Sequence, residues 1–337
     1  MKKNYWLIAI FLLLGGVTVW YYLGGKKSEK STLGWDRQFK VEEKDIQKIF
    51  LANRNGVQTT IQRDGNKWKT NGVPASKNAV ENLLEAVVNI QLQSVPPPAA
   101  TAGIVKELAA RGIKVEIYGK SDKKLKTYYI GGVTPDARGT YAILEGSEQP
   151  MVVEIPMMQG QIRTRYGMTG DDWRDKHVFE YQPDDIAEVS VEYPQLRNKS
   201  FNLKRDGSDW SIKPFYDNVP PINKPLVNGH VEGYLVGFKS LMAEAFQNDF
   251  DAKDSIRHTI PFTVISVTDK KGETRKVAFY PTFRTDKTTG EQRSEVVERY
   301  HADMSTGDWM LVQHRVFEKI FWPYDSFFDV PKNGMKN

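Results

Sequence analysis

The 337-residue chain carries 47 Lys and Arg against 42 Asp and Glu, which gives a formal net charge of +5. Most of this excess lies in residues 1–30, which hold five lysines and one glutamate; the rest of the chain has 42 basic and 41 acidic residues. Because a nucleic-acid-binding protein needs a basic surface, this near-neutral body is not expected to bind nucleic acid. The absence of cysteine excludes a cysteine nucleophile and an N-terminal lipidated cysteine.

An unbroken apolar run spans residues 5–23. As a helix it would be roughly 28 Å long, close to the hydrocarbon thickness of a bilayer. A cleaved signal peptide is the alternative, but it would have a shorter apolar core followed by small residues. Here the run ends in Trp20, Tyr21 and Tyr22, which suit a membrane–water interface. We therefore expect a single transmembrane helix that binds the lipid bilayer through residues 5–23.

The orientation of this helix is less strongly specified. Lys2 and Lys3 precede it and Lys26 and Lys27 follow it, so the positive-inside rule gives almost no bias. Long domains are translocated largely regardless of flanking charge. We therefore expect the N-terminus inside and the bulk of the chain outside.

A pattern of strand and turn signals occurs twice after the apolar run. Residues 45–49 precede the segment Arg63–Trp68, which reads R-D-G-x-x-W, and residues 185–189 precede Arg205–Trp210 in the same way. The copies are separated by 140 residues at their start and by 142 at the tryptophan. Each copy predicts a strand, a turn, a strand of alternating character, and then an Asp-Gly turn that leads into a strand with the tryptophan.

Each copy then predicts an amphipathic helix, over residues 80–92 in the first copy and 231–246 in the second. The apolar residues recur at spacings of three and four, which is typical of a helix covering one face of a sheet. Residues 94–103 contain three consecutive prolines and are not expected in a helix interior or a central strand. Residues 104–111 could form a short helix.

Alternating strands follow in both copies. The first copy predicts strands at 115–118 and 127–130, and the second at 263–267 and 277–280. A closing hairpin, residues 141–144 with 151–155, matches residues 300–303 with 310–314 at a constant offset of 159. The predicted fold is α+β: two tandem related units, each a mostly antiparallel sheet with one main amphipathic helix, after a single transmembrane helix. The expected divisions are 1–30 for the anchor, 33–175 for the first unit and 176–330 for the second.

This order of motifs resembles the DUF4340 family of membrane-anchored bacterial proteins. The matching pieces are Ile46 and Ile49, Arg63–Trp68, Tyr129–Gly132, Gly139–Tyr141 and Trp173–Phe179. The resemblance covers residues 33 to about 325. The second copy departs from it, since Phe279–Thr282 stands where Tyr-Ile-Gly-Gly is expected and no W-R-D-K element follows. The resemblance implies an association with ABC-type membrane proteins related to gliding-motility components, and no established biochemical activity.

Few residues suggest catalytic chemistry. None of the five histidines has the spacing of a metal motif. His301 and Asp303 are two apart on a predicted strand and so share a face; with His314 on the partner strand they could form a metal or acid–base site, or simply a solvated strand face. His177 is expected in a salt-bridge cluster at the boundary between the units.

Three further features have structural explanations. Gly131 and Gly132 are expected in a turn that needs positive φ rather than in a nucleotide-binding loop. Trp68 and Trp210 occupy the same place in both copies and are expected to pack against a core. Residues 317–328 contain six aromatic residues, which either complete the second core or form an exposed patch.

The sequence therefore predicts a membrane-anchored, periplasmic, non-enzymatic accessory or structural subunit of an inner-membrane complex, possibly of ABC-transporter type. Its expected partners are the bilayer and one or more proteins of that complex. We assign no catalytic, cofactor-binding or metal-binding residue. The alternatives are an envelope hydrolase that uses His301 and Asp303, and a small-ligand receptor with a cleft between the two units.

Overall fold

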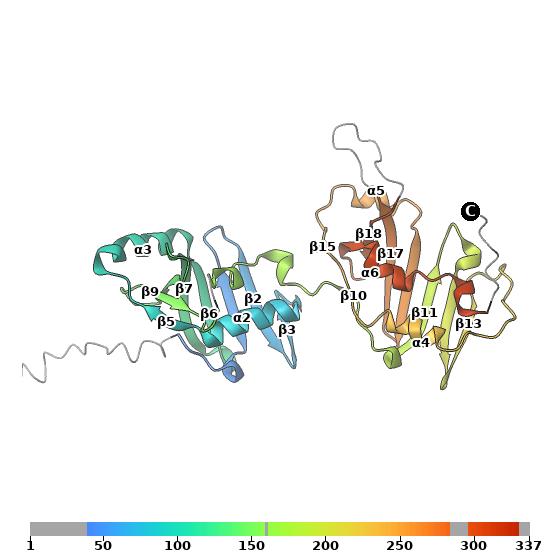
Figure 1. The fold of residues 1–337 in the computed structure, drawn as a ribbon, viewed down its shortest axis with the longest axis horizontal. Helices are drawn as coiled ribbons and strands as arrows, with labels where there is room; N and C mark the ends of the chain where they lie inside the picture. The colour runs from blue at the N-terminus through green and yellow to red at the C-terminus, as the bar shows by residue number, and fades with distance from the viewer. Residues whose placement is uncertain (1–38, 159–160, 284–295, 330–337) are drawn as a thin grey trace, which may run out of the picture. The chain divides into compact units, whose positions relative to one another are not determined.

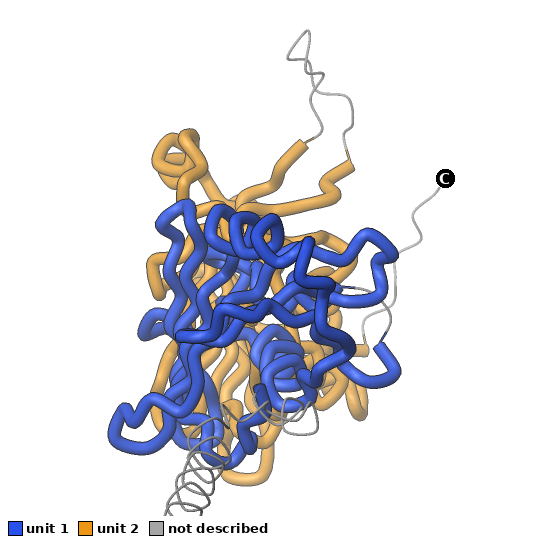
Figure 2. Tube along the Cα trace, turned by 90° about the vertical axis from the view of Figure 1, so that its left-hand side faces the viewer, with its two compact units in different colours: residues 1–175 blue, residues 176–337 orange. Residues whose placement is uncertain are grey.

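The computed structural model describes residues 39–158, 161–283 and 296–329. The predicted transmembrane segment, residues 5–23, lies outside the described residues. Within the described part of the chain, no helix is long and apolar enough to cross a membrane. The contacts divide the chain into two compact units, residues 1–175 and residues 176–337 (Figure 2).

The first unit is built on a nine-stranded antiparallel sheet with the strand order β4-β3-β2-β1-β6-β7-β8-β9-β5 (Figure 1). Its strands are β1 Lys48–Ala52, β2 Gln58–Asp64, β3 Lys67–Thr70, β4 Val73–Pro74, β5 Gln91–Ser94, β6 Ile113–Tyr118, β7 Lys124–Val133, β8 Thr140–Leu144 and β9 Met151–Glu154. Every alternate residue of β1 and β6 is buried, as expected for strands that pack one face on a core. The strands predicted at 115–118 and 127–130 are confirmed.

Two helices accompany this sheet. Helix α2 (Lys77–Asn89) buries its apolar stripe in the core, and its N-cap Ser76 accepts a hydrogen bond from the Ala79 amide. The prediction of a helix to residue 92 was wrong at its end, because Leu92 lies in β5 and pairs with β9. Helix α3 (Pro98–Arg111) lies along β7 and β8. The exclusion of residues 94–103 from a helix was wrong for 99–103. Pro98 is at the first helical position, where the missing N–H costs nothing, so the helix starts directly after the proline run.

The second unit contains an eight-stranded antiparallel sheet with the order β13-β12-β11-β16-β17-β18-β19-β15. Its strands are β11 Ile186–Glu192, β12 Phe201–Asp206, β13 Asp209–Pro214, β15 Ala245–Phe246, β16 Thr263–Asp269, β17 Thr274–Thr282, β18 Arg299–Met304 and β19 Trp309–Gln313. Apart from β4, each strand of the first sheet has a counterpart at the same place in this order. The protein is therefore sheet-rich with few helices, and both large sheets are antiparallel, as predicted.

The main helix of the second unit is much shorter than predicted. Helix α4 spans His230–Val236, so the prediction of a helix to residue 246 was wrong. Leu241 and Met242 instead form β14, which pairs with β10 (His177–Phe179), and Ala245 and Phe246 form β15, which pairs with β19. Leu241 is buried in this arrangement, whereas Met242 is 41% exposed and Phe246 is partly buried. Gly233 and Gly237 make this segment a weak helix former.

The closing hairpins are related by a changed register. Ala142 pairs with Met151, and Ala302 pairs with Met310. Both alanines are buried in the core of their unit, so Ala142 corresponds to Ala302, at an offset of 160. The constant offset of 159 was therefore wrong in this strand. The second hairpin has one residue fewer between these paired residues than the first. An offset of 159 would therefore match each residue of β8 to a residue of β18 that points to the opposite face of the sheet.

The repeated R-D-G-x-x-W motif has the same conformation in both units. The Arg63 guanidinium lies 4.5 Å from the centre of the Trp68 ring, and its Nε donates to the Ile46 carbonyl at 3.3 Å. The Arg205 guanidinium likewise lies 4.5 Å from the centre of the Trp210 ring, and its Nε donates to the Ile186 carbonyl at 3.1 Å. Both tryptophans are partly buried against their cores, which confirms the packing prediction.

The aromatic segment 317–328 completes the second core. Phe317, Tyr324, Phe327 and Phe328 are buried in it, and Phe321 and Trp322 pack against it. The segment forms helix α6 (His314–Phe317) followed by 3-10 turns at Glu318–Ile320 and Tyr324–Phe327. Of the two alternatives left open by the sequence, core packing is correct.

Glu116 on β6 provides a test of electrostatic stabilisation in the first unit. The side chain is 8% exposed and accepts hydrogen bonds from the Tyr118 hydroxyl at 2.7 Å and from Lys124 at 3.3 Å, and forms an ion pair with Lys114 at 2.7 Å. Burial alone would raise the pKa of Glu116, but these donors outweigh it and lower the pKa from 4.5 to about 2. The carboxylate therefore stabilises the fold above pH 4.5, and this contribution is lost as the pH falls from 4.5 towards 2.

We expect Glu116→Gln to lower the free energy of unfolding at pH 7. Between pH 4.5 and 3, the free energy of unfolding of this variant should fall less steeply than that of the wild type. Urea denaturation at several pH values measures both effects. Glu145→Gln is the control, since this side chain is 48% exposed and its ion pair with Lys124 is 3.8 Å long. An identical pH dependence in Glu116→Gln and the wild type would show that Glu116 does not contribute in this way.

Candidate functional site

The residues singled out for chemistry lie on the second sheet. Tyr300, Ala302 and Met304 of β18 face the core, so His301 and Asp303 project from the opposite face, as their spacing predicted. Tyr280 of β17 pairs with His301, and Trp309 of β19 pairs with Asp303. We call Phe250, Arg257, Tyr280, His301, Asp303 and Trp309 the outer-face cluster.

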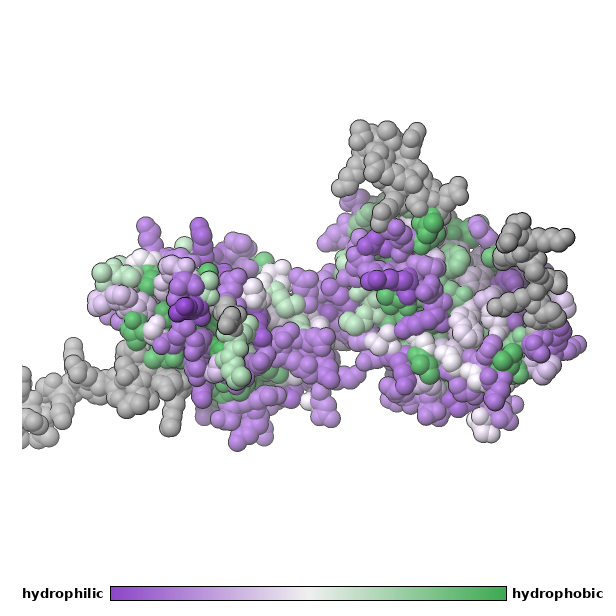
Figure 3. All heavy atoms as spheres, in the orientation of Figure 1, coloured by the Kyte–Doolittle hydropathy of each residue, from purple (hydrophilic) through white to green (hydrophobic). Residues whose placement is uncertain are grey.

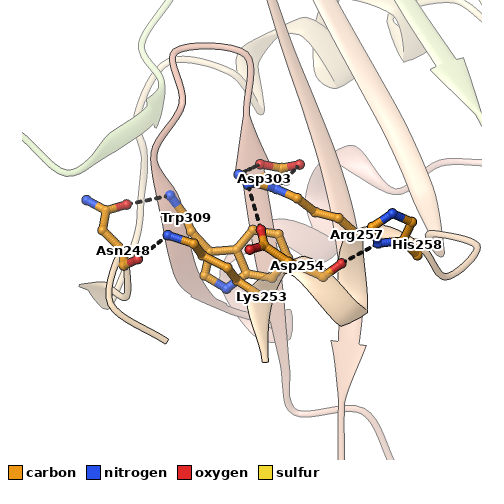
Figure 4. Close-up of polar contacts among 7 residues, drawn as sticks. All are labelled: Asn248, Lys253, Asp254, Arg257, His258, Asp303 and Trp309. Atoms are coloured by element: carbon orange, nitrogen blue, oxygen red, sulfur yellow. Dashed lines mark hydrogen bonds and ion pairs between the residues drawn. The ribbon is translucent and has the colours of Figure 1, made fainter. Parts of the chain in front are cut away.

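A segment of residues 247–258, here called the strap, crosses this cluster. It contains the short helix α5 (Lys253–Arg257). Arg257 binds the Asp303 carboxylate through two hydrogen bonds of 2.6 and 3.0 Å, and its guanidinium lies 5.3 Å from the centre of the Trp309 ring (Figure 4). The Asn248 side chain accepts a hydrogen bond from the Trp309 amide at 2.8 Å. The strap is thus attached to β18 and β19.

Phe250 of the strap and three rings of the sheet, His301, Trp309 and Tyr280, are stacked in a row, here called the column, with the planes of neighbouring rings 26–30° apart. The ring centres of Phe250 and His301 are 4.9 Å apart, those of His301 and Trp309 5.3 Å, and those of Trp309 and Tyr280 5.7 Å. His301 is only 7% exposed and Trp309 is fully buried, so the interpretation of a solvated strand face was wrong. Burial lowers the pKa of His301, which favours the neutral imidazole.

Two polar atoms of this column lack a hydrogen-bond partner among the described residues. They are Nδ1 of His301 and Nε1 of Trp309. An unpartnered polar atom in a buried position costs free energy, so stacking and burial of the rings must stabilise the arrangement.

The structure does not bring His314 into this cluster. Its Nδ1 lies 3.1 Å from the hydroxyl of Tyr300, which faces the core, and its Nε2 lies 3.5 Å from the Glu318 carboxylate. The three-residue metal or acid–base site is therefore not assembled. His177 lies in β10, where its Nε2 is 3.1 Å from the Ser240 hydroxyl.

Other groupings in the described residues are weaker candidates. Asp175, His177 and Glu180 place ligand atoms within 4.8 Å of one another, but they are close neighbours in sequence. A shallow cavity of about 410 Å³ in the first unit is lined by Lys124–Thr127, Leu144 and Glu145. Neither involves the outer-face cluster.

The corresponding surface of the first unit is built differently. In the first unit, Ile130 of β7 pairs with Ile113 of β6; in the second, Phe279 of β17 pairs with Thr263 of β16. The residue that follows in each strand therefore corresponds, so Gly131 stands at the position of Tyr280. A Cβ at Gly131 would lie 2.7 Å from Leu108 Cδ2 of helix α3. Gly131 and Gly132 have no positive φ, so the turn prediction was wrong. The glycine is needed because α3 approaches β7 closely.

Sequence reasoning missed most of the outer-face cluster. The alternation of β18 predicted that His301 and Asp303 share a face. Phe250 and Arg257 lay in a segment without a periodic pattern, so nothing in the sequence linked them to β18. The departure at Phe279–Thr282 includes Tyr280, but its alignment was wrong by one residue: it set Pro281 against Gly131, whereas the strand pairing sets Tyr280 there.

Comparison with known proteins identifies the family. A family model described as a domain of unknown function, DUF4340, matches residues 69–258, which is 190 of the 337 residues and extends from β3 to α5. Neither the curated proteins nor the solved structures include a match to the chain. The chain belongs to the DUF4340 family.

Proposed function

We propose that this protein is a non-enzymatic accessory subunit of an inner-membrane complex, anchored by residues 5–23 and with its two sheet units in the periplasm. The observation that carries the binding role is the use of the candidate catalytic groups in packing. Arg257 holds both oxygens of the Asp303 carboxylate, and His301 is stacked between Phe250 and Trp309. General acid–base catalysis needs groups within reach of a substrate proton, whereas with the strap closed Arg257 occupies the Asp303 carboxylate and Phe250 and Trp309 flank His301.

The surface and the repeat support this proposal. The face of each unit seen in Figure 3 is mostly hydrophilic, with small separate hydrophobic areas. The matched strand orders of the two sheets lead us to infer duplication of one ancestral unit. A partner of ABC-transporter type fits what the family resemblance implies, and the apolar N-terminal run would hold the units beside such a membrane complex.

The proposal is tested by purifying the intact chain from membranes in mild detergent after chemical cross-linking. We expect a multi-pass membrane protein or its ATPase to co-purify. A chain without residues 1–30 should leave the membrane fraction, and its capture of the partner should fall at least tenfold. The matched control is the Arg54→Ala substitution in the β1–β2 turn, which should leave capture unchanged. A strictly monomeric protein without any cross-linked membrane subunit would overturn the proposal.

A further inference from the structure

The strap has few attachments to the sheet. Helix α5 has five residues, and Asp249, Asp251 and Ala252 are exposed. Three strap side chains hold it to β18 and β19: Phe250 stacks on His301, Arg257 binds Asp303, and Asn248 hydrogen-bonds to the Trp309 amide and to Asp308. In the first unit, by contrast, the fourteen-residue helix α3 buries Ile104 and Leu108. The strap should therefore open at a lower free-energy cost than α3.

The ring on which Phe250 stacks can acquire a charge. His301 is 7% exposed, so a proton added to it would create an imidazolium in a buried position. Its Nδ1 has no hydrogen-bond partner among the described residues. Desolvation of a charge is costly unless a counterion compensates it. Whether the strap stays closed therefore depends on the charges around His301.

The Asp303 and Glu244 carboxylates are already paired with arginines. The titratable and charged groups on the strand of His301 and on the elements packed against it include Lys253, Asp254 and Arg257 of the strap, Tyr280 of β17, Arg299 and Asp303 of β18, Asp308 before β19 and Glu244 next to β15. Asp303 is held by Arg257 at 2.6 Å, and Glu244 by Arg299 at 2.8 Å. Arg257 would repel a charged imidazole, since both groups lie against the Trp309 ring.

We propose that the strap is a pH-gated cover: protonation of His301 releases Phe250 and Arg257 from the sheet and exposes the aromatic surface formed by Tyr280 and Trp309. This inference does not depend on the proposed accessory function. It assigns to the second unit a histidine-based response that the first unit lacks, because Tyr141 stands there at the place of His301.

The direction of the pH effect follows from linkage. Burial lowers the pKa of His301 in the closed form below its ordinary value of 6.5. The open form binds the proton first, so the closed strap is fully stable above pH 6.5 and loses stability as the pH falls below it. With an ordinary histidine pKa in the open form, the closed-to-open ratio falls by at most about 30-fold between pH 7.5 and 5.0.

Amide hydrogen exchange of the full chain at pH 7.5 and 5.0, corrected for the intrinsic exchange rates, tests the proposal. Strap amides are hydrogen-bonded in the closed form, for example Gln247 to the Trp309 carbonyl at 2.7 Å. We expect their protection to fall between about threefold and 30-fold at pH 5.0, with no matching loss in peptides from α3 (Pro98–Arg111). Equal protection of the strap at both pH values, or an equal loss in α3, would overturn the proposal.

Two variants assign the effect to His301. His301→Phe keeps a ring in the column but cannot bind a proton, so its strap should remain protected at pH 5.0. His258→Gln removes the exposed histidine of the strap and should keep the wild-type response. Loss of the response in His258→Gln would overturn the assignment to His301, as would its persistence in His301→Phe. If His301→Phe does not fold, the wild-type comparison of the strap with α3 still decides.

Discussion

Replacing Phe327 by alanine should lower the free energy of unfolding of the second unit by about 3–5 kcal/mol, the usual cost of deleting a fully buried phenylalanine ring. Phe327 is fully buried, and its ring centre lies 5.0 Å from that of Phe201, 5.3 Å from that of Tyr234 and 5.5 Å from that of Trp322. The cavity would open where the C-terminal segment meets β12 and α4. Urea denaturation of the purified chain, followed by hydrogen exchange in peptides of the second unit, measures the effect.

Phe283→Ala provides the matched control. This residue follows β17 and is 41% exposed, so its truncation should cost less than about 1 kcal/mol. An effect of Phe327→Ala as small as that of the control would show that segment 317–328 does not stabilise the second unit.

Gly131→Ala should destabilise the first unit by about 1–3 kcal/mol, because it overpacks the contact between α3 and β7. The new Cβ would lie 2.7 Å from Leu108 Cδ2 and 3.2 Å from the Tyr141 carbonyl oxygen. Leu108 is 2% exposed and has little room to move. The free energy of unfolding from urea denaturation is the measurement.

The neighbouring glycine gives a strict comparison. At Gly132 the nearest atom to a new Cβ is the Glu107 carboxylate oxygen at 2.9 Å, at the end of a partly exposed, flexible side chain that can rotate away. Gly132→Ala should therefore cost clearly less than Gly131→Ala. The double variant Gly131→Ala/Leu108→Ala should show a favourable coupling between the two sites. Equal effects of the two glycine substitutions, without coupling to Leu108, would contradict this account of the close approach.

The Gly131→Ala prediction concerns a position at which the two units differ. Where the first unit has a glycine that admits Leu108 of α3, the second has Tyr280, whose ring lies 5.7 Å from that of Trp309. A tyrosine at this position leaves no room for a closely packed helix, and the strap with its five-residue helix α5 lies there instead. One substitution in a strand is thus accompanied by a different cover over the sheet.

Much of the fold could be predicted from local patterns. The Asp-Gly turns, the alternation in β16 and the apolar stripe of α2 each depend on a few neighbouring residues, and each is present in the structure. Gly65 and Gly207, for instance, have φ of 59° and 62°, a conformation that glycine adopts without steric cost. The predicted anchor is not tested, since residues 5–23 lie outside the described residues.

The candidate site was predicted only in part. A period of two along β18 was enough to place His301 and Asp303 on one face. Their burial was not predictable, because it depends on Phe250 and Arg257, which come from a segment some fifty residues earlier. His314 follows β19 directly, yet it turns towards Tyr300 at the core face as α6 begins.

The sequence by itself determined the duplicated order of strands, the turn positions and the membership of the motifs in two units, since these follow from spacing and from residue types that act locally. Only the tertiary structure decided that residues 241–242 and 245–246 form strands instead of a helix, that β18 is shifted by one residue relative to β8, and that the strap covers His301. The physical reason is that these outcomes depend on which distant partner buries an apolar side chain, and the same apolar pattern allows more than one partner.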